Sequence, residues 1–211
     1  MSEQAGAIPD LDLTALISSR ICHDVISPVG AISNGLEVLS DETDEGMREQ
    51  AMDLIMKSAQ QASAKLQFAR LAFGAAGSAG AEIDLRDAEK VANDFVQGKH
   101  SLTWKGPLLN MPKNKVKLLL NLIALGVTAL PRGGTVDVEI DEQGNRFGVR
   151  STGKAARLAE PVVAMLTGAP ANGELPDAHS IQPYFARRIA DAIGLTIAVE
   201  PSEDQVILKA G

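Results

Sequence analysis

The sequence predicts an α+β protein in which a long N-terminal helical hairpin precedes a domain of mixed helices and strands. Three observations lead to this prediction: two long stretches with helical periodicity, a tract of small residues after them, and alternating apolar segments beyond that tract. The small-residue tract, residues 74–81, is the clearest domain boundary. We therefore expect a hairpin domain at residues 1–76 and a second domain at residues 77–211.

Two long helices are predicted over residues 10–40 and 46–74, separated by a polar turn. In each, apolar or small side chains recur every three or four positions and form one stripe along the helix. The first stripe is formed by Leu13, Ile17, Ile21, Val25, Ile32, Leu36 and Leu39. The second is formed by Met47, Ala51, Leu54, Ile55, Ser58, Ala62, Leu66, Ala69 and Phe73. Two helices of similar length joined by a short turn are typical of a helical hairpin.

A lone hairpin cannot bury both of its apolar stripes. Two hairpins together make a four-helix bundle, so we expect a homodimer in which the N-terminal domains of two chains form this bundle. The alternative is that both helices pack on the remainder of the same chain.

The second domain mixes two periodicities. The helices are predicted over residues 84–97, 112–130, 156–167 and 180–193. The strands are predicted over residues 135–140, 146–150, 196–199 and 205–209. The pair Gly144-Asn145 predicts a hairpin between the first two strands. Helices combined with an antiparallel sheet favour an α/β sandwich.

The composition argues against several classes of protein. A chain of 211 residues with 45% apolar residues can bury a core, which aliphatic side chains must fill because aromatic residues make up only 3%. The net charge of −7 argues against nucleic acid as a partner. No apolar run approaches the roughly 18 residues of a membrane span, and the first ten residues lack the pattern of a signal peptide. Since Cys22 is the single cysteine, we expect no internal disulfide and a cytoplasmic protein without a membrane partner.

The stretch of residues 20–29 is the part of the sequence most informative about chemistry. At 100° per residue, His23 lies about 160° from both Ile21 and Val25, so it points away from the apolar stripe and toward solvent. A partner protein can approach the imidazole closely, because its neighbours on that face are small or polar. These neighbours are Ser19, Ser27, Gly30 and Asn34.

Pro28 lies inside the first predicted helix. It removes the hydrogen bond to the carbonyl of Asp24 and is expected to bend the helix one turn after His23. A proline in a helix interior costs roughly 3 kcal/mol, so we interpret it as a structural element of the site. Neutral histidine has a nucleophilic nitrogen near neutral pH, and attack by Nε2 on an acyl phosphate gives a phosphoramidate. Asp24 can orient the ring or accept its proton.

Residues 23–29, His-Asp-Val-Ile-Ser-Pro-Val, resemble the H-box of histidine kinase dimerisation domains, where His-Glu/Asp-Leu-x-Thr/Ser-Pro-Leu is typical. The resemblance implies that His23 is the phosphorylated residue and that Asp24 assists transfer. Ser27 matches the polar position that in kinases helps to dephosphorylate a bound receiver. Ile26 replaces the usual basic residue, which departs from the kinase pattern.

The second domain resembles the ATP-binding domain of these kinases, with its ligand positions altered. Asn121 matches the first asparagine of the N-box, but Leu125 replaces the second, which in the family helps to hold magnesium. Ser151 replaces the adenine-binding aspartate and Ala155 replaces the second glycine of the same box. The Gly-x-Gly of the phosphate loop is replaced by Ser180-x-Gln182, which lacks the glycines that allow close backbone approach to phosphate. Together these replacements imply that the ATP site is lost while the fold persists.

Over nearly its whole length the chain resembles the ChpT-type histidine phosphotransferases of bacterial phosphorelays. The resemblance implies that His23 accepts a phosphoryl group from a receiver aspartate of a hybrid histidine kinase of the CckA type. From there the group passes to the receiver aspartates of response regulators of the CtrA and CpdR type. Magnesium then comes with the partner receivers, and the chain itself is expected to bind no ATP, no other cofactor and no metal.

The receiver is expected to dock on the face around His23, at Ser19, Arg20, Gly30 and Asn34. Cys22 is interpreted as a small neighbour of His23, since one Cys–His pair has too few ligands for a zinc site. His100 and His179 lie in predicted loops or near predicted helix starts, without acidic neighbours that suggest catalysis.

Three alternatives from other classes remain at this stage. An active histidine kinase with an atypical ATP site requires ATP binding. A non-catalytic dimeric adaptor predicts that His23→Ala leaves function intact. A phosphatase that drains receivers through Asp24 and Ser27 predicts release of inorganic phosphate. The identity of the partners, the direction of net phosphate flow, the handedness of the hairpin and the receiver contacts of the second domain do not follow from the sequence.

Overall fold

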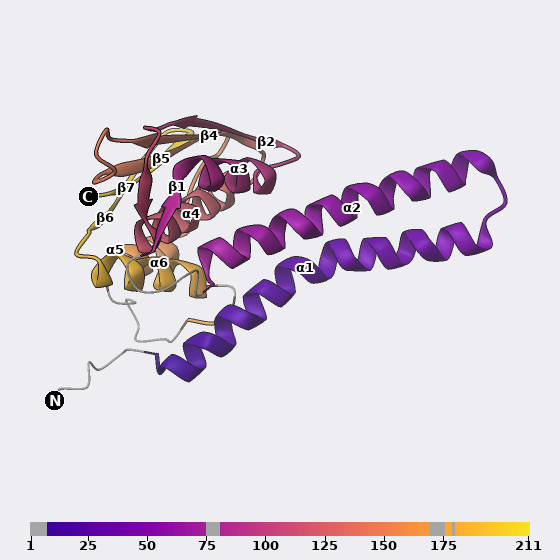
Figure 1. Ribbon diagram of the computed structural model, residues 1–211, viewed down its shortest axis with the longest axis horizontal. Coiled ribbons are helices and arrows are strands. Elements are labelled where there is room, and N and C mark those ends of the chain that lie inside the picture. The colour runs from indigo at the N-terminus through magenta and orange to yellow at the C-terminus, as the bar shows by residue number, and fades with distance from the viewer. Residues whose placement is uncertain (1–7, 75–80, 169–175, 179) are drawn as a thin grey trace.

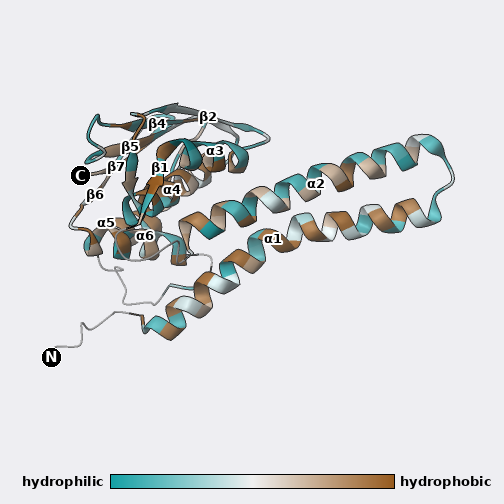
Figure 2. Ribbon diagram, in the orientation of Figure 1, coloured by the Kyte–Doolittle hydropathy of each residue, from teal (hydrophilic) through white to brown (hydrophobic). Residues whose placement is uncertain are grey.

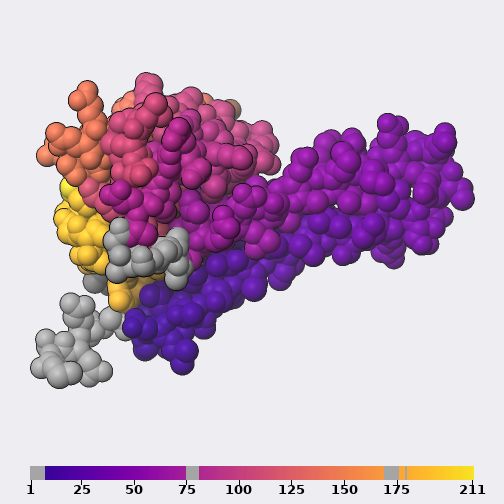
Figure 3. Space-filling view, viewed as in Figure 1, coloured from indigo at the N-terminus to yellow at the C-terminus, as the bar shows by residue number. Residues whose placement is uncertain are grey.

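A computed structural model describes residues 8–74, 81–168, 176–178 and 180–211. Within these ranges, two long antiparallel helices project as an arm from a layered C-terminal domain (Figures 1 and 3). The helices are α1 (Asp10–Asp41) and α2 (Glu45–Ala72), which confirms both helices predicted for the hairpin. None of the helices in the described ranges is long and apolar enough to cross a lipid bilayer.

Local interactions close the tip of the hairpin. The side chain of Asp44 caps α2 by accepting a hydrogen bond from the backbone N–H of Met47 at 2.9 Å. Arg48, in the first turn of α2, donates to the carbonyl of Glu42 at 2.9 Å and to that of Leu39, so it satisfies carbonyls at the C-terminal end of α1. The polar run between the helices therefore forms a tight, specified turn.

The C-terminal domain contains a five-stranded sheet in the order β2-β4-β5-β7-β6. Its strands are β2 (His100–Lys105), β4 (Gly134–Ile140), β5 (Phe147–Thr152), β6 (Ile197–Ser202) and β7 (Gln205–Ala210). The last four confirm the predicted strands. However, β2 pairs with β4 in parallel, so the sheet is mixed and the prediction of an antiparallel sheet is wrong at this edge. Two further short strands pair separately, β1 (Glu82–Asp84) and β3 (Asn110–Pro112).

Four helices accompany the sheet: α3 (Leu85–Phe95), α4 (Lys113–Thr128), α5 (Glu160–Thr167) and α6 (Ile181–Ala192). All four were predicted, but α5 begins four residues later than expected. The reason is that the preceding segment bonds elsewhere: the backbone N–H of Ala156 donates to Gly153 and that of Arg157 donates to Ala129. These hydrogen bonds replace the i to i−4 bonds that a longer helix requires.

The core of this domain lies between the sheet and α4. Every residue of α4 from Leu118 to Gly126 is buried, and the inward side chains of β4, β5 and β7, such as Val138, Val149 and Leu208, are fully buried as well. A helix that is apolar on all sides is typical of a central core element.

The C-terminal end of α2 is part of this core. Ala72 is fully buried, and the ring of Phe68 stacks on that of Phe95 from α3 with 3.9 Å between centroids. The hairpin is thus attached to the second domain by packing as well as by the chain connection. The predicted boundary between residues 76 and 77 lies outside the described residues.

Candidate functional site

His23 lies near the middle of α1 with its side chain 66% exposed. The four residues predicted to share its face are exposed as well: Ser19, Ser27, Gly30 and Asn34. This confirms the helical phase derived from the periodicity. Because their side chains are small or polar, the imidazole stands on a surface that another protein can approach.

The carboxylate of Asp24 lies on the Nδ1 side of this imidazole. Its Oδ1 is 3.6 Å from Nδ1 of His23, which is longer than a hydrogen bond but close enough for electrostatic attraction. Its Oδ2 accepts a hydrogen bond from Nε of Arg20 at 3.0 Å. Arg20 was predicted as a docking residue, and the structure places it in an ion pair one helical turn from Asp24. With the carboxylate at Nδ1, Nε2 is the nitrogen suited to a nucleophilic role.

Pro28 is buried inside α1, and the helix changes direction part-way along its length (Figure 1). Its missing N–H leaves the carbonyl of Asp24 without its usual helical donor. That carbonyl instead accepts a hydrogen bond from Nζ of Lys65 on α2, at 2.9 Å. Lys65 was not identified from the sequence, because nothing local links two residues that are 41 positions apart.

The residues at the kinase-like ATP boxes take part in packing. Asn121 is fully buried, and its Nδ2 donates to the carbonyls of Ala72 at 3.1 Å and Lys117 at 2.9 Å. Nε2 of Gln182 donates to Oδ1 of Asn121 at 3.3 Å, and Leu125 is buried in the core. The amide of Asn121 therefore caps the C-terminal end of α2 and joins the hairpin to the second domain.

Two further positions that the resemblance assigns to these boxes lie on β5 and in the turn after it. Ser151 is fully buried on β5, and its Oγ has no hydrogen-bond partner in the described part of the chain. Ala155 has a φ of 62°, a left-handed conformation that glycine adopts readily. Its backbone N–H donates to Oδ1 of Asp204 at 2.6 Å, which holds the turn in place.

The other candidate residues do not form a second site. His100 begins strand β2 and its Nε2 is 3.1 Å from the carbonyl of Leu130, so the prediction of a loop or helix start is wrong for it. His179 lies outside the described residues. Cys22 is exposed. In the described ranges, no three His, Cys, Asp or Glu side chains are grouped so that they could hold a metal ion.

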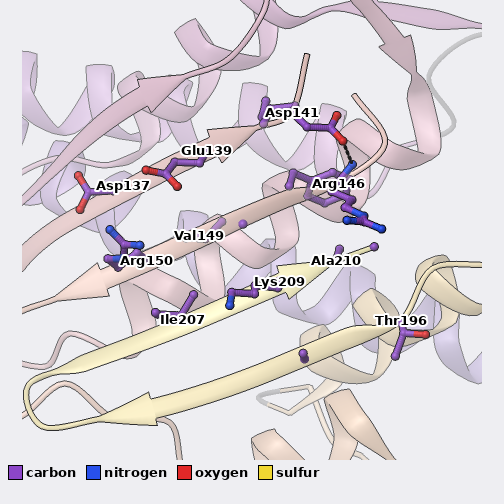
Figure 4. Close-up of a pocket in the computed structure, with 15 residues that line it drawn as sticks. Asp137, Glu139, Asp141, Arg146, Val149, Arg150, Thr196, Ile207, Lys209 and Ala210 are labelled. Carbon is purple, nitrogen blue, oxygen red and sulfur yellow. Dashed lines mark hydrogen bonds between the residues drawn. The ribbon is translucent and has the colours of Figure 1, made fainter. Parts of the chain in front are cut away.

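A cavity of about 590 Å³ lies on the face of the sheet opposite α4 (Figure 4). None of its lining residues comes from the hairpin. Charged side chains on this face form cross-strand pairs of opposite sign: Asp137 is opposite Arg150 in the register, and Lys209 of the lining pairs at 2.7 Å with Glu200, which lies outside the lining. Such cross-strand pairs are typical of a solvated sheet face.

Comparison with known proteins finds relatives by sequence and by structure. Residues 85–205 match the family model described as histidine phosphotransferase C-terminal domain. The chain is 46% identical over 203 residues to the protein phosphotransferase ChpT of Brucella abortus (strain 2308), with 95% of each chain covered. A solved structure of a bacterial phosphotransferase aligns with a TM-score of 0.88 and 43% identity, covering 97% of this chain and 98% of the other. A histidine kinase domain from Erythrobacter litoralis aligns with a TM-score of 0.48 and 14% identity, covering 96% and 93%.

Proposed function

Because this chain belongs to the ChpT-type family of histidine phosphotransferases, we propose that it relays a phosphoryl group between receiver domains through His23. The observation that supports this role most directly is the exposed imidazole of His23, with the Asp24 carboxylate on its Nδ1 side and the small or polar residues Ser19, Ser27, Gly30 and Asn34 on the same face of the helix. Both features suit a nucleophile that must enter the active site of another protein.

The transfer step uses the lone pair of Nε2. It attacks the phosphorus of an aspartyl phosphate on the donor receiver, and the bond between phosphorus and the aspartate oxygen breaks, with its electron pair left on the carboxylate. The new N–P bond gives the ring a positive charge, which the nearby carboxylate of Asp24 stabilises or relieves by accepting the Nδ1 proton. In the second half, an aspartate oxygen of the acceptor receiver attacks phosphorus, and the N–P bond returns its electron pair to Nε2.

The receivers dock on the face of α1 around His23, where Ser19, Ser27, Gly30 and Asn34 are exposed. By the family resemblance, the donor is the receiver of a hybrid histidine kinase of the CckA type, and the acceptors are response regulators of the CtrA and CpdR type. Magnesium comes with the receivers, since carboxylate oxygens that bind it are part of those partners.

ATP is not the phosphoryl donor in this proposal. Leu125 offers no oxygen ligand for magnesium and Ser151 replaces the aspartate that binds adenine in the kinases. Asn121, whose counterpart belongs to the kinase ATP site, has its amide engaged with Ala72 and Gln182. The chemistry of these residues supports a domain that retains the fold for attachment of the hairpin and for partner binding.

The working unit in this proposal is a homodimer with two His23 sites. Large apolar side chains of the hairpin remain exposed in the single chain, among them Leu36 at 54% and Leu66 at 50%. Apolar bands also recur along both helices out to the far end of the arm (Figure 2). A groove of about 530 Å³ between the helices, lined by Ile17, Ile21, Leu66 and Phe73 among others, continues this surface. Extended apolar surface of this kind favours pairing with a second hairpin.

A transfer assay with two donors tests the proposal. In one tube the protein is mixed with ³²P-labelled ATP and magnesium, and in the other with a receiver domain carrying a ³²P-labelled aspartyl phosphate. We expect label from the receiver alone. That label should be acid-labile and absent in His23→Ala, which should remain a dimer because the side chain faces solvent. Label taken directly from ATP would show that the second domain is a working kinase domain and would refute the proposal.

A further inference from the structure

Asp24 is held at two of its oxygens by cations from two helices. Its side-chain Oδ2 accepts from Arg20 at 3.0 Å, and its backbone carbonyl accepts from Lys65 at 2.9 Å. The third oxygen, Oδ1, is the one that lies 3.6 Å from Nδ1 of His23. The two contacts thus leave a single carboxylate oxygen directed at the imidazole.

The contact with Lys65 exists because of Pro28. In a regular helix the carbonyl of residue 24 accepts from the N–H of residue 28, and proline has no N–H. Burying a backbone carbonyl without a hydrogen-bond donor costs free energy, so a replacement donor stabilises the fold at this point. Nζ of Lys65 fills this position from the neighbouring helix, and a charged donor makes a stronger hydrogen bond than a neutral one.

Lys65 differs in this respect from Lys57, eight residues earlier on α2. Lys57 is exposed and pairs with Asp53 at 3.5 Å on its own helix. Lys65 is half-buried and lines a small crevice between the hairpin and the second domain, together with Arg20, Asp24 and Phe95. Its ammonium group therefore binds a backbone carbonyl at the bend of α1.

We propose that Lys65 is a positioning residue for phosphoryl transfer at His23, an inference that rests on the proposed function. By replacing the donor that Pro28 lacks, it fixes the backbone of Asp24 at the bend and so the place of Oδ1 beside the imidazole. Lys65 precedes Phe68 by one turn, and Phe68 is stacked on Phe95 of α3. Through this stacking the second domain helps to hold Lys65, and so the Asp24 carboxylate, in place beside His23 without touching His23 itself.

A double-mutant cycle tests this role. Lys65→Met removes the donor and keeps the aliphatic stem, and Lys57→Met is the matched control with the same change of charge on the same helix. Lys65→Arg restores a charged donor. Pro28→Ala returns the missing backbone N–H to α1 and is expected to fold, because alanine favours a helix more than proline does. The double variant Pro28→Ala with Lys65→Met completes the cycle.

We expect Lys65→Met to slow transfer from a ³²P-labelled receiver domain about tenfold under single-turnover conditions, since a small misplacement of a reacting group has effects of this order. The affinity for the unphosphorylated receiver should stay unchanged. Lys57→Met should transfer at the wild-type rate, and Lys65→Arg should recover most of the loss. In the Pro28→Ala background, Lys65→Met should have little further effect, because the new N–H can donate to the Asp24 carbonyl.

The backbone ¹³C chemical shift of the Asp24 carbonyl, measured by NMR on unphosphorylated protein, gives a second readout that needs no receiver. It should move in Lys65→Met and stay in place in Lys57→Met. Equal transfer rates for Lys65→Met and the wild type would overturn the role of Lys65 alone, as would an equal loss from Lys65→Met with and without the Pro28→Ala substitution. A wild-type protein that takes no label from the receiver would overturn the proposed function together with this inference.

Discussion

Ala155 has a backbone conformation that suits glycine better than alanine. Its φ of 62° lies in the left-handed region, where a Cβ atom is strained by roughly 1–2 kcal/mol. We expect Ala155→Gly to raise the free energy of unfolding by about 1 kcal/mol, after allowing for the greater freedom of glycine in the unfolded chain. Urea denaturation at a fixed protein concentration measures this change.

The neighbouring Ala156 provides the control for this prediction. It is buried and is not among the residues with positive φ. Ala156→Gly removes a buried methyl group and relieves no strain, so its free energy of unfolding should fall by about 1 kcal/mol. Loss of stability in both variants would contradict the explanation by strain at Ala155.

At the same scale, the sequence predicted the placement of His23 but not the contacts that surround it. The phase of His23 follows from a local periodicity, and Asp24 and Pro28 lie within five residues of it. The contacts of Lys65 with Asp24 and of Asn121 with Ala72 join segments that are 41 and 49 residues apart. They depend on how one element is rotated against another, and the spacing of residues along one helix does not define that rotation.

Among the elements, α1 and α2 approach each other closely where glycine allows it. A Cβ added at Gly35, which is buried, would lie 2.6 Å from Cγ1 of Ile55 and 3.3 Å from the carbonyl of Ala51. A Cβ added at Gly30 on the same helix would meet nothing within 4 Å. Both substitutions by alanine remove the same unfavourable helix propensity, worth about 1 kcal/mol.

We therefore expect opposite effects from the two alanine variants of α1. Gly30→Ala should raise the free energy of unfolding by about 1 kcal/mol, because alanine has the better helix propensity. Gly35→Ala should lower the free energy of unfolding by a similar amount, because the strain of overpacking against Ile55 is larger than the gain in helix propensity. Thermal and urea denaturation at one protein concentration provide the measurement. An equal increase in the free energy of unfolding in both variants would show that α1 and α2 can move apart at Gly35 without cost.

The start of α3 gives a prediction about pH. Hydrogen bonds from the Arg86 side chain, and then from its backbone N–H, hold the pKa of the Asp84 carboxyl below its usual value. A carboxyl with a lowered pKa stabilises the fold fully above its unfolded pKa, about 3.9, and this contribution is lost as the pH falls further toward the folded value. The stability gap between the wild type and Asp84→Ala should therefore be constant near neutral pH and narrow below about pH 4.

Urea titrations between pH 7 and pH 3 measure this gap. Arg86→Met removes the side chain that lowers the pKa of Asp84 most and serves as the control: in this background the gap should narrow less. A gap for Asp84→Ala that is flat across the whole range would mean that the contact with Arg86 does not stabilise the charged cap.

The elements missed by the sequence interpretation were missed for different reasons. Strand β2 carries an alternating pattern, in which Leu102 and Trp104 point inward between exposed Ser101, Thr103 and Lys105, so a signal for it was present. Strands β1 and β3 have three residues each, too few for any period to be visible. The parallel pairing of β2 with β4 depends on the path of the chain across the sheet, which local alternation does not encode.

In the whole molecule, the hairpin exposes more large apolar side chains than the second domain does. The second domain buries most of its large apolar side chains, with Leu108 an exposed exception, whereas the hairpin leaves many large apolar side chains in water. Each such side chain gains roughly 1.5–3 kcal/mol when it is fully buried, so a second hairpin provides a sufficient driving force for association. The proposed dimer contact should consequently depend on α1 and α2 and not on the sheet.

This conclusion leads to a test by charge insertion. Leu36 on α1 and Leu66 on α2 are each about half exposed, and a glutamate at either position would have to be desolvated in the bundle. We expect Leu36→Glu and Leu66→Glu to convert the protein to monomers in sedimentation velocity at micromolar concentration. Gln60→Glu is the control, because Gln60 is exposed and lies about 120° around α2 from Leu66, and this variant should remain dimeric.

The monomeric variants also test whether a receiver needs one hairpin or two, because α1 carries His23 on its solvent face. Monomers that still take label from a receiver would show that docking needs one hairpin only. Monomers that take no label would place part of the receiver site on the second chain. Persistence of the dimer in both leucine variants would contradict the assignment of this surface to the bundle.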